Sequence, residues 1–124
     1  MRALGSRRAL GAFGERVAAA HLEAKGYVIL DRNYRRRDCE IDLIAEKDGV
    51  VAFVEVKTRR GASMGTAIEG ISETKVQRLL RGVERYGYEH PGLAPDRRID
   101  IIAIDLAPDG RVLSVEHIEG AVVR

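Results

Sequence analysis

The sequence predicts a single α/β domain, in which helices cover the faces of a β-sheet, and three observations support this prediction. The hydrophobic pattern predicts one helix, three strands, a second helix and two further strands, in that order. The third strand, residues 50–58, is apolar on both faces, as expected of a central strand that is covered on both sides. A chain of 124 residues is long enough to bury one core without disulfides or structural metal ions, so we expect one domain over its whole length.

The composition is that of a globular domain rather than of a disordered or fibrous segment, with 45% hydrophobic and 32% charged residues. The one cysteine, Cys39, cannot form a disulfide within the chain, which fits a reducing compartment. No apolar run approaches the ~20 residues that cross a bilayer, and the first residues lack the apolar core of a secretory signal. We therefore expect a cytoplasmic protein that does not span a membrane.

Basic and acidic residues are partly segregated along the chain, although the net charge is only +2. Residues 1–37 contain nine basic and three acidic residues, whereas residues 38–124 contain twelve and sixteen. Seventeen of the 21 basic residues are arginine, the side chain that binds phosphate groups through two parallel hydrogen bonds. Two interpretations stay open at this point: the arginines bind a polyanion, or they reflect the base composition of the genome.

Residues 11–25 predict the first helix, because they are good helix formers and Gly26 can end the helix as a C-terminal cap. Residues 1–10 are expected to form a flexible basic N-terminus. Glu15 places a carboxylate in a stripe of small apolar residues, where an uncharged side chain would be less costly to bury. Apolar residues on both sides predict a substantially buried helix, with Phe13, Val17, Ala20 and Ala24 on one face and Ala18, Ala19 and Leu22 on the other.

The remaining elements follow from alternation, helical spacing and turn residues. The basic tip at 35–38 and the pair Asp48 and Gly49 predict hairpin turns between the first three strands. A loop at 59–65 and a capping box at 66–69 precede the second helix, and a loop at 87–95 follows it. The predicted strands are residues 27–34, 39–46, 50–58, 98–105 and 111–118, and the second helix is residues 72–86.

The short aspartate-glycine turn fixes the register of the hairpin that it closes. Counting back from the turn places Asp42 opposite Glu55. Two positions further on, Glu40 lies opposite Lys57. Like charges that face each other in this way, ~5 Å apart, repel by about 3 kcal/mol at an effective dielectric constant of ~20. Since the flanking valines favour a partly buried setting, the acidic pair needs a proton, a cation or a neighbouring base.

A divalent hard cation, Mg²⁺ or Mn²⁺, is the best candidate for offsetting the two acids. Mg²⁺ prefers oxygen ligands and is commonly held by one or two carboxylates together with water and phosphate oxygens, so Asp42 and Glu55 are the candidate ligands. Lys57 follows Glu55 on the same predicted strand face, where its ammonium would offset charge that develops on a phosphoryl oxygen. Glu15 would complete the set from the first helix. The alternative interpretation is an ordinary exposed cluster of ion pairs.

Three segments carry a family resemblance: Gly14-Glu15, Glu40-Ile41-Asp42-Leu43-Ile44 and Ala52-Phe53-Val54-Glu55-Val56-Lys57-Thr58-Arg59. They resemble the YraN-like uncharacterised protein family, which looks like a branch of the restriction-endonuclease-like PD-(D/E)XK superfamily and is similar to archaeal Holliday junction resolvases. The resemblance covers residues 11–121 and implies a mixed central sheet flanked by helices, in the order αβββαββ. It also implies that Asp42 and Glu55 bind the metal ion, that Lys57 is the catalytic lysine and that Glu15 is the helix acid.

The resemblance extends to two further positions. Arg98-Ile99-Asp100 falls where the family often has Arg-Phe-Asp, and Lys75 falls where the resemblance places a lysine early in a helix. Cys39 is a departure, because the family usually has glycine before the Glu-Ile-Asp run. From the residues alone we interpret Cys39 as a packing residue, Asp100 as a structural residue or ion-pair partner, and His21, His90 and His117 as structural or surface residues.

Together, the residues and the resemblance predict a metal-dependent endonuclease that hydrolyses DNA phosphodiester bonds with Mg²⁺ or Mn²⁺. The similarity to resolvases implies a branched or structured DNA substrate and a homodimer. Two alternatives stay open: a catalytically silent nucleic-acid-binding module, and an interaction domain of a DNA-processing complex. Contacts to DNA phosphates are expected from Arg35, Arg36, Arg37, Arg59, Lys75 and Arg78, with a solvated basic surface as the alternative for each.

Overall fold

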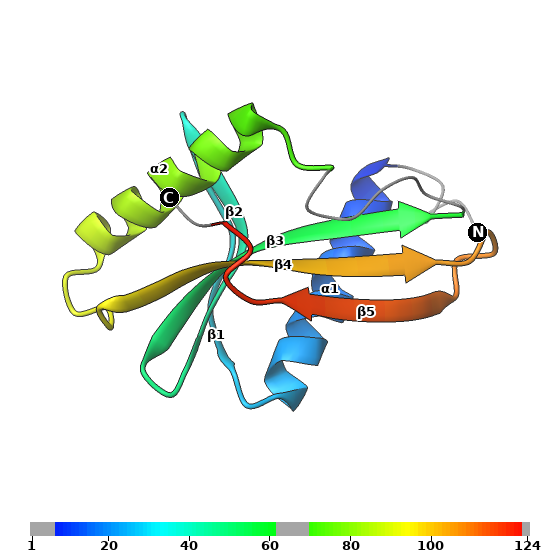
Figure 1. Ribbon diagram of the computed structural model, residues 1–124, viewed down its shortest axis with the longest axis horizontal. Helices are drawn as coiled ribbons and strands as arrows, with labels where there is room; N and C mark the ends of the chain where they lie inside the picture. The colour runs from blue at the N-terminus through cyan, green and yellow to red at the C-terminus, as the bar shows by residue number, and fades with distance from the viewer. Residues whose placement is uncertain (1–6, 62–69, 123–124) are drawn as a thin grey trace.

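The computed structural model describes residues 7–61 and 70–122, which form an open five-stranded sheet with one helix on each face (Figure 1). The elements follow in the order αβββαββ, so the predicted fold class is confirmed. The helices are α1 (Arg7–Ala24) and α2 (Glu73–Glu89), and the strands are β1 (Val28–Arg36), β2 (Cys39–Lys47), β3 (Val50–Arg60), β4 (Asp96–Leu106) and β5 (Val112–Ile118).

The strands lie in the order β1-β2-β3-β4-β5, with β3 at the centre of the sheet. Neighbouring strands are antiparallel except β3 and β4, which run parallel, so the sheet is mixed as expected. A parallel pair needs a crossover connection, and the segment that contains α2 provides it. The prediction of a central third strand is confirmed, although β3 continues to Arg60, into the predicted loop.

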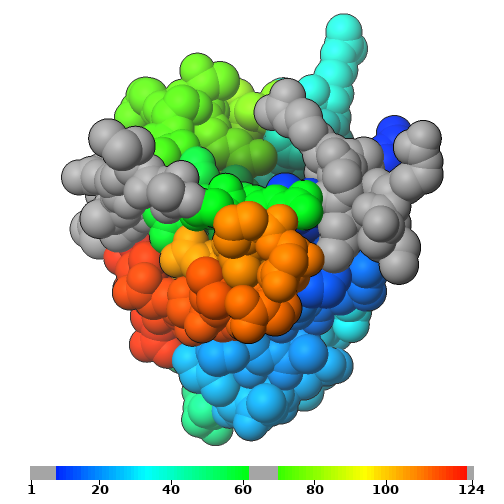
Figure 2. Space-filling model, turned by 90° about the vertical axis from the view of Figure 1, so that its right-hand side faces the viewer, coloured from blue at the N-terminus to red at the C-terminus, as the bar shows by residue number. Residues whose placement is uncertain are grey.

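The side chains of β3 alternate between two hydrophobic layers. Ala52 and Val54 pack in the layer under α1, whereas Val51 and Phe53 pack in the layer under α2. The space-filling view shows α2, in yellow-green, and the later part of α1, in blue, on opposite sides of the orange end of β4 (Figure 2). Further core residues are Ala18, Ala19, Leu22, Leu43 and Ile102 in the first layer, and Ile41, Ile44, Leu79, Tyr86 and Ile99 in the second.

Gly14 brings α1 into close contact with β3. A Cβ atom at this position would lie 2.0 Å from Thr58 Oγ1 and 3.6 Å from Val56 Cγ1, so a larger residue would push the helix away from the strand. The next residue in the helix is Glu15. The close approach at Gly14 therefore holds the carboxylate of α1 near the central strand.

Helix α1 starts earlier and is less buried than predicted. It begins at Arg7, so residues 7–10 are helical, whereas we expected them to belong to a flexible N-terminus; residues 1–6 lie outside the described part. Ala20 and Ala24 are exposed. The prediction of burial on both sides was therefore wrong, because α1 packs on the sheet through one face and no element among the described residues covers its outer face.

Helix α2 begins as predicted but ends later. The hydroxyl of Ser72 accepts a hydrogen bond from a backbone amide of the first turn, which caps the helix. Gly87 was expected to start a loop, yet α2 continues to Glu89, because packing on the sheet outweighs the low helix propensity of glycine. The predicted capping box at 66–69 lies outside the described residues. Within the described residues, neither helix is long and apolar enough to cross a membrane.

A buried polar network joins β4 to the end of the chain. Asp100 is fully buried and accepts hydrogen bonds from Arg98 Nε at 2.8 Å, His117 Nε2 at 2.8 Å and Gly120 N at 2.9 Å. Arg98 Nη2 also donates to Tyr27 Oη at 2.7 Å. Although burial opposes it, the hydrogen bonds from His117, Arg98 and Gly120 lower the pKa of Asp100, so the carboxylate stays ionised. Asp100 therefore has the structural, ion-paired position predicted for it.

Cys39 and His90 also occupy packing positions. Cys39 is a free thiol that is fully buried in the layer under α2, as predicted. Burial raises the pKa of this thiol, which keeps it in its unreactive form. The ring of His90 stacks on Tyr86, with the ring centroids 3.9 Å apart.

Asp100→Ala is expected to lower the free energy of unfolding by about 3–5 kcal/mol, because it leaves Arg98 and His117 without their shared buried partner. Asp109→Ala is the matched control. Asp109 forms an exposed ion pair with Arg111, so its removal should cost less than about 1 kcal/mol. Urea unfolding measures both changes, and equal losses in the two variants would contradict the importance of the buried network.

Candidate functional site

The main-chain ladder between β2 and β3 ends at the predicted acidic residues. The predicted register is confirmed over the five pairs that run from the turn to Leu43 opposite Val54. Beyond this pair, Asp42 Oδ2 accepts a hydrogen bond from Val56 N at 2.8 Å. Because the Asp42 side chain, and not a main-chain carbonyl of β2, accepts this hydrogen bond, β2 and β3 separate at this point.

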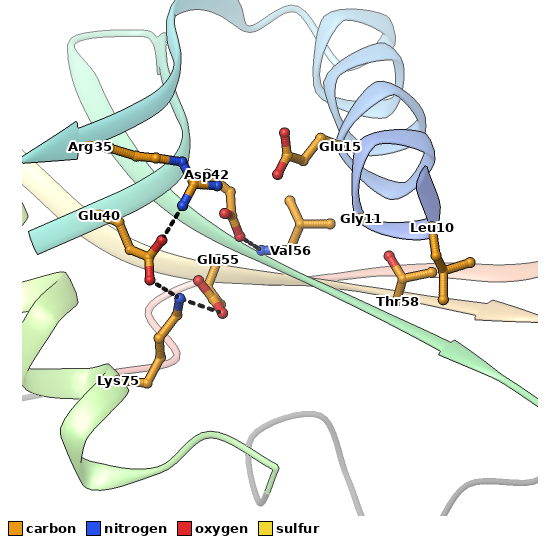
Figure 3. Close-up of a pocket in the computed structure, with 10 residues that line it drawn as sticks. All are labelled: Leu10, Gly11, Glu15, Arg35, Glu40, Asp42, Glu55, Val56, Thr58 and Lys75. Atoms are coloured by element: carbon orange, nitrogen blue, oxygen red, sulfur yellow. Dashed lines mark hydrogen bonds and ion pairs between the residues drawn. The ribbon is translucent and has the colours of Figure 1, made fainter. Parts of the chain in front are cut away.

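The parted strands open a pocket of about 340 Å³ that both helices border (Figure 3). Three of the four residues predicted as catalytic line it: Glu15 from α1, Asp42 from β2 and Glu55 from β3. Figure 3 shows their carboxyl groups directed toward the same space. The other lining residues are Leu10, Gly11, Arg35, Glu40, Val56, Thr58 and Lys75.

Glu55 is the most buried carboxyl of the pocket. The residue is 8% exposed, and its buried Oε1 has no hydrogen-bond partner among the described residues. Burial raises the pKa of Glu55 to about 8, with further contributions from the negative charge of Asp42 and a hydrogen bond to it, while the positive charge of Lys75 opposes the rise. At neutral pH Glu55 therefore keeps a proton unless a cation takes its place.

Lys75 supplies a positive charge beside these acids. Its Nζ lies 3.0 Å from Glu40 Oε1 and 3.7 Å from Glu55 Oε2. Glu40 also pairs with Arg35 Nη1 at 2.5 Å and with Arg78 Nε at 3.6 Å. Although burial opposes it, the hydrogen bond and charge of Lys75 and the charges of the two arginines lower the pKa of Glu40. The ionised Glu40 thus fixes Lys75 next to Glu55.

Lys57 contacts the loop before α2 instead of the acids. Its Nζ donates to Gly70 O at 2.9 Å, and it does not line the pocket. The predicted pairing of Lys57 with Glu40 does not form, because the ladder ends before it reaches these residues. The lysine beside the acids of the pocket is therefore Lys75, which we expected to contact DNA. We had expected Lys57 in this position. A catalytic role of Lys57 stays a prediction.

The six residues predicted to contact DNA fall into three groups. One group surrounds Glu40 at the pocket, and a second is exposed around the turn between β1 and β2. The third consists of a single arginine, which pairs with Asp105 on β4 at 2.9 Å. The group around Glu40 consists of Arg35, Lys75 and Arg78. The group around the turn consists of Arg36 and Arg37, and the arginine paired with Asp105 is Arg59.

Asn33 is a residue of this site that the sequence reasoning missed. Its side chain acts on Glu15 by lowering the pKa of that carboxyl, and its Oδ1 accepts a hydrogen bond from Arg35 Nη2 at 3.3 Å. Burial and the charge of Asp42 raise the pKa of Glu15, and the Asn33 contact opposes this rise. Asn33 has a φ of 52°, in the left-handed region that asparagine tolerates better than most residues. An asparagine inside a predicted strand, where this residue type is depleted, was the available signal.

The oxygen atoms of the pocket fit a hard divalent cation. Within residues 7–61 and 70–122, no three His, Cys, Asp or Glu side chains are grouped so as to hold a metal ion, so these residues offer no complete cage. Mg²⁺ does not require one, since it commonly keeps water and phosphate oxygens beside one or two carboxylates. Asp42 and Glu55 provide such a pair, and Oε1 of Glu55 is a buried oxygen with unused bonding capacity.

Comparison with known proteins assigns the chain to a family. The model of the Uncharacterised protein family UPF0102 matches residues 14–104. The chain belongs to this family. The matched residues include all four positions predicted as catalytic, Glu15, Asp42, Glu55 and Lys57, and the YraN-like resemblance is confirmed.

Relatives in the UPF0102 family match most of the chain. A UPF0102 protein of Frankia alni is 42% identical over 119 residues, which cover 96% of this chain and 98% of the relative. One of Kineococcus radiotolerans is 41% identical over 113 residues, covering 90% and 92%. One of Symbiobacterium thermophilum is 45% identical over 105 residues, covering 85% and 89%. The names of these relatives state the family and no activity, so the matches establish family membership and not a function.

The raised pKa of Glu55 predicts a pH-dependent stability of the metal-free protein. Between pH 4.5 and about 8 the folded chain keeps a proton on Glu55 that the unfolded chain releases, so the free energy of unfolding should fall as pH rises through this window. Glu55→Gln removes the titrating group and should flatten this fall, whereas Glu116→Gln, on exposed β5, should follow the wild type. Thermal unfolding across the window measures the three curves. Parallel curves for Glu55→Gln and the wild type would show that the pH dependence does not come from the raised pKa of Glu55.

Proposed function

We propose that this UPF0102 chain is a metal-dependent endonuclease that hydrolyses phosphodiester bonds of DNA in the cytoplasm. The observation that carries the proposal is the convergence of Asp42 and Glu55 in one pocket, with one buried carboxylate oxygen of Glu55 left without a partner among the described residues. Burial, with a smaller contribution from the neighbouring Asp42, raises the pKa of Glu55, which is costly for a purely structural site. Binding a divalent cation there would offset this cost.

The residues of the pocket would divide the work of hydrolysis. Asp42 and Glu55 would hold Mg²⁺ or Mn²⁺, which when bound supplies Lewis-acid chemistry toward a phosphate oxygen and a water molecule. Glu15, which borders the same pocket, would orient the attacking water. Lys57, two residues after Glu55, would move from the Gly70 carbonyl to the phosphate and offset the charge of the transition state.

The charges around the pocket favour a phosphate-containing polymer as substrate. Arg35 lines the pocket beside the acids, Arg36 ends β1 and pairs with Glu89, and Arg37 is exposed on the adjoining turn. Such contacts bind the DNA backbone and carry no sequence information. The similarity to resolvases that we expect from the sequence favours a branched or structured DNA. Within the described residues the acids would repel phosphate in the absence of a cation, which favours a metal-dependent enzyme over a silent DNA-binding module.

Mn²⁺ is expected to raise the Tm of the wild type, because an ion that binds only the folded state stabilises it by mass action. Asp42→Asn and Glu55→Gln should abolish this shift, since each removes one of the two carboxylates. Asp31→Asn, on β1 and outside the pocket lining, should keep it. Differential scanning fluorimetry measures all four proteins. If both pocket variants respond to Mn²⁺ like the wild type, the ion binds elsewhere and the proposed metal site is wrong.

Cleavage of a panel of branched, nicked and duplex DNAs with Mn²⁺ tests the activity itself. Lys57→Ala is expected to lower the rate by about 10²–10³-fold, as loss of a charge-stabilising donor does, while the Mn²⁺ shift in Tm is retained. Lys47→Ala, at the far end of the same hairpin, should cut like the wild type. Full activity of Lys57→Ala with an inactive Lys75→Ala would transfer the role to Lys75. Binding without cleavage of any DNA would favour the silent module instead.

A further inference from the structure

The outer surface of α2 carries a stripe of four exposed residues, Arg81, Glu84, Arg85 and Tyr88, which we call the α2 stripe. Their spacing places them on one face of the helix. The opposite face is buried against the sheet through Val76, Leu79, Gly82 and Tyr86. Figure 1 accordingly shows α2 at the outside of the molecule, with none of the labelled helices and strands beyond it.

Two members of the stripe lack partners within the part of the chain that the structure describes. Tyr88 is 88% exposed, more than any other large hydrophobic residue described, and makes no ring contact there. Glu84 forms no ion pair there either. Among the described residues, Arg85 makes a long ion pair with Asp38, at 3.7 Å. Arg81 Nη1 lies 3.5 Å from the backbone carbonyl oxygen of Asp38.

We propose that the α2 stripe is the interface of a homodimer, in which the α2 helices of two copies pack antiparallel about a two-fold axis. With the axis between positions 84 and 85, Glu84 of each copy lies opposite Arg85 of the other. Arg81 of each copy then lies opposite Tyr88 of the other, where a guanidinium can pack on the ring. Each contact occurs twice, as two-fold symmetry requires. Glu84 and Tyr88, which lack partners within one copy's described residues, each gain one.

The charges of this surface favour a second copy over DNA. The hollow at the stripe, about 630 Å³ in volume, is lined by three acids and two arginines, and Glu89 is already paired with Arg36 of β1, so its charges are balanced and give a phosphate backbone no net attraction. A parallel arrangement of the two helices would place like charges opposite each other. Exposed tyrosine and arginine are also the residue types enriched at protein interfaces. The lining residues are Asp38, Arg81, Glu84, Arg85, Tyr88 and Glu89.

The α2 stripe shares no residue with the pocket around Glu55, so this inference does not depend on the proposed nuclease activity. Four residues per copy cover less than the roughly 800 Å² per partner of a standard interface. The dimer is therefore weak, and because its central contacts are exposed ion pairs, it dissociates further as the salt concentration rises.

Charge reversal tests the pairing by sedimentation equilibrium over a range of protein concentrations. Glu84→Arg and Arg85→Glu each place like charges opposite each other twice, so each should weaken dimerisation by about tenfold or more. The double variant Glu84→Arg/Arg85→Glu exchanges the two charges and should restore dimerisation to near the wild-type level. This rescue is expected only if position 84 of one copy faces position 85 of the other.

Truncation of an exposed side chain provides the matched control. Tyr88→Ser should weaken the dimer, whereas Leu113→Ser, which removes a comparably exposed hydrophobic residue from β5, should not. All variants change exposed residues, and an unchanged Tm verifies that they fold. A wild type that is monomeric at every concentration, a double variant without rescue, or equal effects of Tyr88→Ser and Leu113→Ser would each overturn the proposal.

Discussion

The arrangement of the pocket depends on one hydrogen bond, from the Val56 amide to the carboxylate of Asp42. A regular hairpin would use a main-chain carbonyl as the acceptor. Because the Asp42 side chain takes its place, the ladder stops and β2 and β3 separate. The change is also visible in the packing of β2. Ile41 and Ile44 both lie in the layer under α2, although residues three apart in a regular strand face opposite sides. The strand thus changes its orientation at Asp42, beside Glu55.

A chain of alternating charges makes the close pair of acids tolerable. Arg35 pairs with Glu40, Glu40 pairs with Lys75, and Lys75 approaches Glu55. Glu55 is therefore next to a cation that the carboxylate of Glu40 holds in place. Among the described residues, Glu55 is the one left with an unsatisfied buried side-chain oxygen, and burial together with the charge of Asp42 raises its pKa. A site with this residual imbalance is suited to accept one more positive charge, which is the physical basis of the proposed metal binding.

Helix α2 links the two surfaces that we assign. Lys75 in its first turn approaches the pocket, while the α2 stripe lies on its later turns and faces away from the sheet. The helix is held rigidly by its buried face, since Gly82 packs against Ile41: a Cβ atom at Gly82 would lie 2.7 Å from Ile41 Cδ1. A dimer formed through the stripe would consequently leave the pocket residues in place, and the two surfaces can be tested separately.

The sequence by itself determined the features that depend on neighbouring residues. Asp48 and Gly49 adopt positive φ angles of 51° and 78°, and this turn alone set the hairpin register, because the two strands that it joins are adjacent in the chain. Alternation and helical spacing likewise predicted the order of the elements. The tertiary structure alone decided where the ladder ends and which lysine meets the acids. Lys57 follows Glu55 in sequence, yet Lys75 approaches the carboxylates, because the docking of α2 on the sheet brings distant residues together and no local pattern encodes that contact.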